Sequence, residues 1–157
     1  MPRHLTEVLL LAALAAAVVL LWPRAHRIAT PYFADAALTP GALNAAVTQA
    51  TIGSTICVSG WTRTIRPAAE YTGALKLRQM RDYDAHGPPS AYQEDHLISL
   101  ELGGAPSDPR NLWPQPRPWA DEVDRTENQL REEVCSGRLS LAEAQRRESA
   151  LKHGDNR

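Results

Sequence analysis

The chain has 157 residues, of which 43% are hydrophobic, and it carries 17 basic and 18 acidic side chains. This composition suffices for one packed domain of about 110 to 120 residues behind an N-terminal segment. The formal net charge of −1 excludes a protein that attracts nucleic acid through a positive field over its whole surface, so any affinity for a polyanion has to be local.

The N-terminal part contains an unbroken apolar run over residues 8–22. As a helix this run would span roughly 22 Å, which is short of the ~30 Å hydrocarbon core of a membrane. That length favours a signal peptide, with an uncleaved membrane anchor as the alternative, over residues 1–23. Residues 24–43, which prolines interrupt, are expected to be a linker. The protein is thus expected to be exported: periplasmic, secreted, or anchored to the outer face of the cytoplasmic membrane, with membrane contact only through this segment.

The folded domain is expected over residues 44–152 and should begin with a pair of strands. The β-branched residues of segment 51–58 favour a strand, and residues 61–66 resume it after a glycine. Cys57 and Cys135 lie far apart and lack the spacing of a metal site. In an exported chain they are expected to form a disulfide, whereas in a cytosolic chain they would be two separate buried thiols.

A helix with a basic face is expected over residues 71–83. Five basic side chains and a single acid, Glu70, occur between residues 63 and 81. Such a stripe suits contacts with backbone phosphates, which carry no sequence information, and a solvated helix face is the alternative. The residues expected to contact nucleic-acid backbone are Arg63, Arg66, Lys76, Arg78, Arg81 and, later in the chain, Arg110.

The candidate site lies on a predicted hairpin. Asp95 and His96 stand side by side ahead of an apolar stretch. Gly103 and Gly104 predict a reversal of the chain, and Asn111 follows on the returning strand. A neutral imidazole can take a proton from water near neutral pH, and an aspartate supplies the kind of oxygen that Mg²⁺ prefers. Asn111 offers either a carbonyl oxygen to a metal or a hydrogen bond to the imidazole ring. These residues indicate metal-assisted phosphodiester hydrolysis.

Two helices are expected after the hairpin. Residues 118–134 carry apolar side chains at helical spacing, with acidic side chains on another face. Ser140 and Glu143 have the spacing of a capping box and predict a last helix through about residue 152. The tail over residues 153–157 is expected to be disordered.

Together, Asp95-His96, Gly103-Gly104 and Asn111-Leu112, followed by a helix, resemble the HNH or His-Me finger (ββα-metal) endonucleases. The likeness is closest to small exported bacterial proteins similar to these endonucleases, and it covers roughly residues 44–146. The resemblance implies an α+β fold in which a small ββα-metal core carries an added N-terminal strand pair and flanking helices.

The resemblance also implies roles for individual residues. His96 would be the general base, Asp95 a metal ligand, and Asn111 a metal ligand or the residue that orients the base. The histidine that this family usually carries on its helix is absent, so Asp124, and after it Asp121, is expected to replace it as a ligand. The implied cofactor is a divalent ion, with Mg²⁺ preferred and Mn²⁺ or Zn²⁺ as alternatives.

The sequence thus predicts an exported, metal-dependent HNH-type nuclease that hydrolyses phosphodiester bonds in nucleic acid, with DNA favoured over RNA. The alternative is a non-catalytic exported protein that keeps the HNH fold as a disulfide-stabilised binding module, because folds persist in proteins that have lost their chemistry. The absent helical histidine and the lack of net positive charge favour the alternative. No sequence feature indicates a protein partner.

Overall fold

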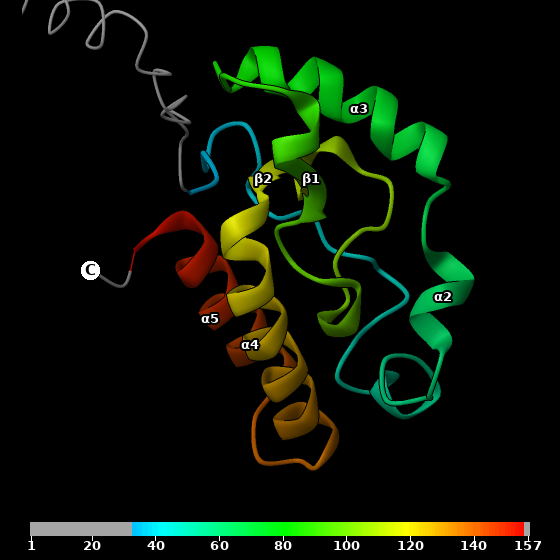
Figure 1. Ribbon diagram of the computed structural model, residues 1–157. Helices are drawn as coiled ribbons and strands as arrows, with labels where there is room; N and C mark the ends of the chain where they lie inside the picture. Colours follow the sequence, from blue (N-terminus) through cyan, green and yellow to red (C-terminus); the bar gives the residue numbers. More distant parts are fainter. Residues whose placement is uncertain (1–32, 156–157) are drawn as a thin grey trace, which may run out of the picture.

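Two short antiparallel strands lie between one helix and a pair of helices in the computed structural model, which describes residues 33–155 (Figure 1). The prediction of an α+β fold is confirmed, and the predicted signal peptide or anchor falls outside the described residues. Within the described part, no helix combines the length and the apolar character needed to span a membrane. The elements in chain order are α2 (Trp61–Ile65), α3 (Ala69–Asp82), β1 (Tyr92–His96), β2 (Leu112–Pro116), α4 (Arg117–Cys135) and α5 (Leu141–His153).

Strands β1 and β2 pair so that Asp95 lies opposite Trp113 and His96 opposite Leu112. The predicted antiparallel pair is therefore present, but the connection between the strands is longer than a tight hairpin. The apolar residues after His96 do not extend β1; they turn into the core as the 3₁₀ turn Leu100–Leu102. A second 3₁₀ turn, Pro109–Asn111, leads directly into β2, so that Asn111 precedes the returning strand.

The prediction of an N-terminal strand pair is wrong. Segment 51–58 forms the 3₁₀ turn Ile52–Ser54 followed by further turns, and residues 61–65 form helix α2. Threonine side chains bond locally in this segment: the hydroxyl of Thr55 donates to the carbonyl of Thr51 at 2.7 Å, and the amide of Thr48 donates to the hydroxyl of Thr51 at 2.8 Å. Such local hydrogen bonds compete with a strand ladder, and the described residues offer this segment no partner strand.

The three long helices agree with the sequence predictions to within about two residues, as is usual for helix ends. Helix α5 begins as the capping box predicts, because the hydroxyl of Ser140 accepts a hydrogen bond from the amide of Glu143 at 3.2 Å. Helix α4 ends ahead of Gly137, whose φ of +75° is a left-handed conformation that glycine adopts at low cost.

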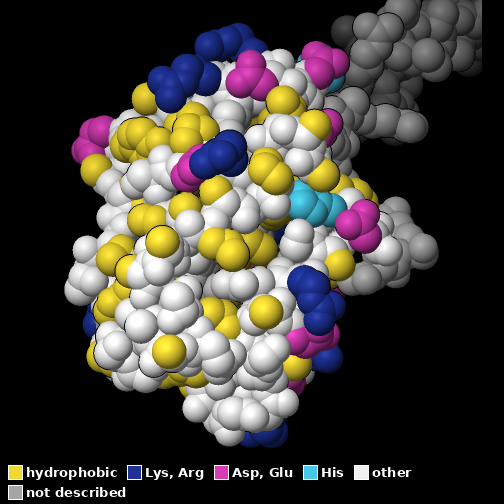
Figure 2. Space-filling model, turned by 180° about the vertical axis from the view of Figure 1, so that it is seen from behind, with side chains coloured by type: hydrophobic (Ala, Val, Ile, Leu, Met, Phe, Trp, Pro, Cys, Tyr) yellow, Lys and Arg dark blue, Asp and Glu magenta, His cyan; other side chains and the backbone are white. Residues whose placement is uncertain are grey.

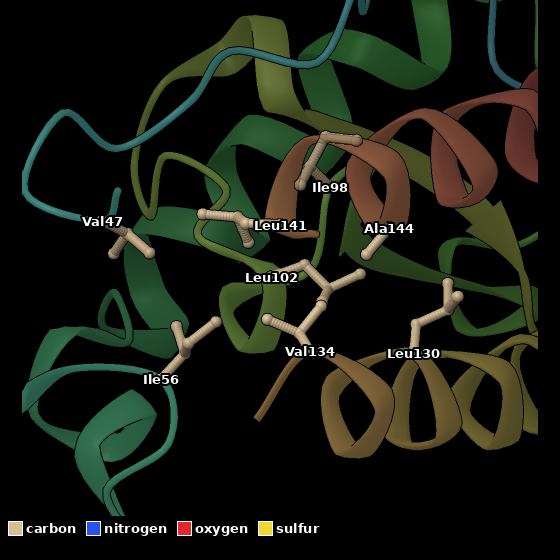
Figure 3. Close-up of a cluster of buried hydrophobic side chains, with 8 residues drawn as sticks. All are labelled: Val47, Ile56, Ile98, Leu102, Leu130, Val134, Leu141 and Ala144. Atoms are coloured by element: carbon tan, nitrogen blue, oxygen red, sulfur yellow. The ribbon is translucent and has the colours of Figure 1, made fainter. Parts of the chain in front are cut away.

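A hydrophobic core joins α4, α5 and the loop between the strands (Figure 3). The side chains of Leu102 and Val134 point toward each other at its centre, and Ala144 reaches it from α5. The complete cluster consists of Val47, Ile56, Ile98, Leu102, Leu130, Val134, Leu141 and Ala144. This core fixes the loop that follows His96 against the two C-terminal helices.

The predicted disulfide between Cys57 and Cys135 is confirmed, with Cα atoms 5.6 Å apart. It ties the turns of segment 51–60 to the end of α4. On the chain-entropy model, closing a loop of this size contributes about 4 kcal/mol to stability.

The part of the expected linker that the structure describes packs against the domain. The amide of Ala34 donates to the carbonyl of Lys152 at 2.9 Å, and the buried hydroxyl of Thr39 lies 2.6 Å from that of Tyr83. Leu43 forms an isolated β-bridge with Gly104. This segment therefore covers the C-terminal end of α5 and the loop between the strands.

Candidate active site

The predicted site residues Asp95, His96 and Asp124 line one pocket, which has a volume of about 360 Å³. Strand β1 and the start of the following loop form one wall, and α4 forms another. The lining residues are Arg66, Gln93, Glu94, Asp95, His96, Ser99, Leu100, Glu101, Asp124, Glu127 and Asn128. Five of them are acidic and one is an arginine, so the pocket is strongly polar and bears a negative charge.

His96 ends β1 and is only 6% exposed. Its Nε2 lies 3.0 Å from the carbonyl oxygen of Pro106, which can only accept a hydrogen bond. Nε2 therefore carries the proton, and the neutral ring keeps its lone pair on Nδ1. Burial, the largest influence, lowers the pKa of His96, while the Pro106 carbonyl and Asp95 act in the opposite direction. The neutral base is thus the form that the fold favours.

A buried lysine that the sequence analysis missed lies behind the pocket. Lys152 of α5 is fully buried, and its Nζ donates to the carbonyl oxygen of His96 at 2.5 Å. The same nitrogen lies 2.6 Å from Glu127, 3.1 Å from Glu148 and 3.5 Å from Asp95. Burial alone lowers the pKa of Lys152, but these three carboxylates outweigh it and raise the pKa above its usual value. Lys152 thus stays charged and holds the end of β1 on α5.

Glu148 supports the loop next to the site. Its carboxylate accepts the amide of Ser99 at 2.9 and 3.0 Å and is fully buried. In the sequence, Glu148 and Lys152 are spaced four residues apart, which is typical of an exposed ion pair on a helix surface. Only the packing of α5 against β1 and α4 shows that both are interior, so sequence spacing alone carries no signal for this network.

Two further carboxylates of the pocket have buried oxygens without a hydrogen-bond partner among the described residues. The atoms concerned are Oε1 and Oε2 of Glu94 and Oε2 of Glu101. Burial raises the pKa of Glu94 to about 8, and Lys76 and Arg78 only partly offset this effect. An unpartnered buried carboxylate is costly, so these groups suit a site that binds a cation or a hydrogen-bond donor.

Asn111 does not line the pocket, contrary to its predicted role as a metal ligand. Its side chain is fully buried, and its Oδ1 accepts the amide of Ile98 at 2.9 Å. Its Nδ2 donates to the carbonyls of Ile98 and Ala105 at 2.9 and 3.0 Å. Asn111 therefore closes the loop between the strands and fixes the backbone just after His96.

Asp124 lies on the exposed side of α4 and reaches the pocket, with Glu127 one turn further along. The side chain of Asp121 is outside the described part of the structure. Among the described residues, no group of three or more His, Cys, Asp or Glu side chains is arranged to hold a metal ion by itself. A cation bound next to Asp95 would thus need water or substrate oxygens to complete its coordination, as is usual for Mg²⁺.

The predicted phosphate-binding residues do not share one surface. Arg66 lines the pocket and Arg63 lies in a neighbouring cavity, whereas the side chain of Lys76 donates to the carbonyls of Pro89 and Tyr92 at 3.1 and 3.2 Å. A separate cavity is lined by Arg78, Arg81 and Arg110. On the face drawn in Figure 2, Lys and Arg side chains lie in several separate places, with acidic side chains between them.

Comparisons with models of known protein families, with curated proteins and with solved structures found no match. The distinguishing features of the pocket are a buried imidazole with a fixed tautomer, a set of oxygen donors, and one arginine.

Proposed function

We propose that this pocket hydrolyses phosphodiester bonds in nucleic acid, with His96 as the general base and a divalent cation bound beside Asp95. The observation that carries the proposal is the hydrogen bond from Nε2 of His96 to the carbonyl of Pro106. It fixes the protonated nitrogen away from the reaction and leaves Nδ1 as the base.

The donor set fits a hard divalent cation such as Mg²⁺. Apart from the imidazole and Arg66, the polar groups that line the pocket are carboxylates, amides and one hydroxyl. Asp95 and Asp124 would hold the ion, and the carboxylate of Glu101 also lines the pocket. When bound, such an ion supplies positive charge that neutralises a phosphate and its leaving oxygen.

The chain's own groups carry out the proton transfer and bind the phosphate. Nδ1 of His96 takes a proton from water, and the water oxygen forms the new bond to phosphorus as the bond to the leaving oxygen breaks. The positive ring that results is stabilised by its hydrogen bond to Pro106 and by Asp95. Arg66 provides a guanidinium that can bind a non-bridging phosphate oxygen. Solvent supplies the proton to the leaving alkoxide.

Replacing His96 tests the proposal directly. We expect His96→Ala to lower the rate of DNA hydrolysis by the full-length protein in Mg²⁺ by a factor of about 10² to 10⁴, because the general base is lost. The matched control is His86→Ala, since His86 lies exposed in a loop outside the pocket, and it should leave the rate unchanged. Equal activity of the wild type and His96→Ala would remove His96 from the mechanism.

A second candidate function is a non-catalytic binding module with the same scaffold. The observation that favours it is the ion pair between Lys152 and Asp95, which already gives the proposed metal ligand a cationic partner. The two functions differ in their need for a metal: the enzyme requires a divalent ion beside Asp95, whereas the binding module does not.

A further inference from the structure

A second cavity, of about 260 Å³, adjoins the proposed active site. Glu101 lines both cavities, so the two are neighbours separated by this side chain. Helix α2 with the turn before it forms one side of the second cavity, and α4 forms the other. Its lining residues are Ile56, Val58, Ser59, Gly60, Thr62, Arg63, Glu101 and Arg131.

The two cavities differ in charge. The active-site pocket contains five carboxylates and one arginine, whereas the second cavity contains two arginines and the shared Glu101. Arg63 and Arg131 form no ion pair with a described carboxylate. By contrast, Arg110, Arg146 and Arg147 each have a carboxylate partner. The second cavity thus presents two guanidinium groups that form no ion pair with a carboxylate of the part of the chain that the structure describes.

Both guanidinium groups are positioned by the backbone around them. Nε of Arg131 donates to the carbonyl of Ile56 at 2.8 Å, which anchors the side chain and leaves its terminal amino groups for a ligand. The guanidinium of Arg63 lies against Gly60, where an added Cβ would come within 2.6 Å of Nη2. A side chain at position 60 would displace that head group. Because Gly60 has no side chain, Arg63 can fold over the cavity.

We propose that the second cavity binds a backbone phosphate of the nucleic-acid strand, next to the phosphate that is cleaved. The proposal rests on the proposed function and adds a path for the strand: from His96 past Glu101 into the groove between α2 and α4, and not along α3. Guanidinium groups match the geometry of phosphate oxygens, and Ser59 and Thr62 add hydroxyls to the lining. The carboxylate of Glu101 opposes phosphate binding in the second cavity, but the two guanidinium groups there outnumber it.

Binding measurements test this subsite without requiring catalysis. The probe is fluorescein-labelled single-stranded DNA, and its anisotropy is followed in Mg²⁺ with full-length protein that carries His96→Ala. Adding Arg63→Gln or Arg131→Gln should weaken binding by about tenfold each, because each removes a charged hydrogen bond. Each should also reduce the slope of log K against log salt by about 0.7. The matched control is Arg125→Gln on the exposed part of α4 outside both cavities, which should bind like its parent.

A small substrate separates binding in the subsite from chemistry. Bis(p-nitrophenyl) phosphate has one phosphate and cannot reach the second cavity, so Arg63→Gln should leave its hydrolysis unchanged while raising KM for DNA. Binding of DNA by Arg63→Gln as tight as by Arg125→Gln would overturn the subsite, and so would an equal loss of activity on both substrates. If the wild type hydrolyses neither substrate, the proposed function fails, and the anisotropy result still decides whether this cavity binds phosphate.

Discussion

At the scale of single residues, Gly104 and Asn111 hold the loop that carries the site. A Cβ added to Gly104 would lie 1.8 Å from the carbonyl oxygen of Ile98 and 2.5 Å from Nδ2 of Asn111. The first of these contacts is with backbone, which cannot move aside cheaply. Glycine at this position therefore lets the amide of Asn111 reach the loop backbone behind His96.

Gly104→Ala should destabilise the protein by about 3 kcal/mol or more, because the methyl group overlaps the backbone and the Asn111 amide. The matched control is Gly73→Ala in α3, where no atom apart from the neighbouring residues and the nearby backbone of the helix itself lies within 4 Å of the added carbon. That substitution should stabilise the protein by about 0.5 to 1 kcal/mol. Urea unfolding of both variants gives the comparison, and equal stabilities would contradict the tight contact.

Asp108 gives the stability a defined dependence on pH. Its carboxylate accepts hydrogen bonds from the side chain and the amide of Arg110 at 2.6 to 3.1 Å, and these bonds lower the pKa of Asp108. Because its pKa is lower in the folded state, the stabilisation is present above the unfolded pKa of about 3.9 and is lost as pH falls through the folded pKa.

Asp108→Asn should therefore lower stability near pH 7, and the difference from the wild type should shrink steadily below about pH 4. Unfolding by urea at a series of pH values checks this. A difference that stays constant down to about pH 2 would show that the carboxylate charge contributes nothing.

At the scale of elements, α5 holds the site through Lys152, although it contributes no residue to the pocket lining. The fully buried ammonium of Lys152 balances the carboxylates of Glu127 and Glu148 and binds the end of β1. A buried cation with three acidic partners is costly to disturb, since removing it leaves uncompensated buried charge.

Lys152→Met should cost about 3 to 5 kcal/mol of stability. The other lysine, Lys76, provides the matched control: it is partly exposed and its bonds are to carbonyls, so Lys76→Met should cost only about 1 kcal/mol. Chemical denaturation of the two variants compares them. A Lys152→Met protein as stable as Lys76→Met would mean that the buried charges are not coupled.

The same elements show what the sequence can predict. Helix α4 follows from apolar side chains at helical spacing, and α5 from its capping box. The strand expected over residues 51–58 does not form, because β-branched threonines bond locally and no strand within residues 33–155 pairs with this segment. Asp95, His96 and Asp124 line one pocket, whereas Asn111, which was expected beside them, does not. Tertiary packing buries Lys152 and lets Asn111 close the loop, and sequence spacing gives no signal for either.

At the scale of the whole molecule, the hydrophobic core and α5 both hold the loop that has His96 at its start and Asn111 at its end. The overall charge is close to zero, yet two adjoining cavities carry opposite local charge. This arrangement suits a pocket that takes a divalent cation beside the base and a phosphate strand alongside it.

Calorimetric titration of the full-length protein with Mn²⁺ tests that arrangement most directly. The wild type and a control, Asp84→Asn on an exposed turn outside the pocket, should bind one ion with the same affinity. Asp95→Asn should bind Mn²⁺ at least about tenfold more weakly, because the substitution removes a side chain that binds the metal directly. A wild type that binds no Mn²⁺, or an Asp95→Asn protein that binds it as tightly as Asp84→Asn, would contradict a metal site beside His96.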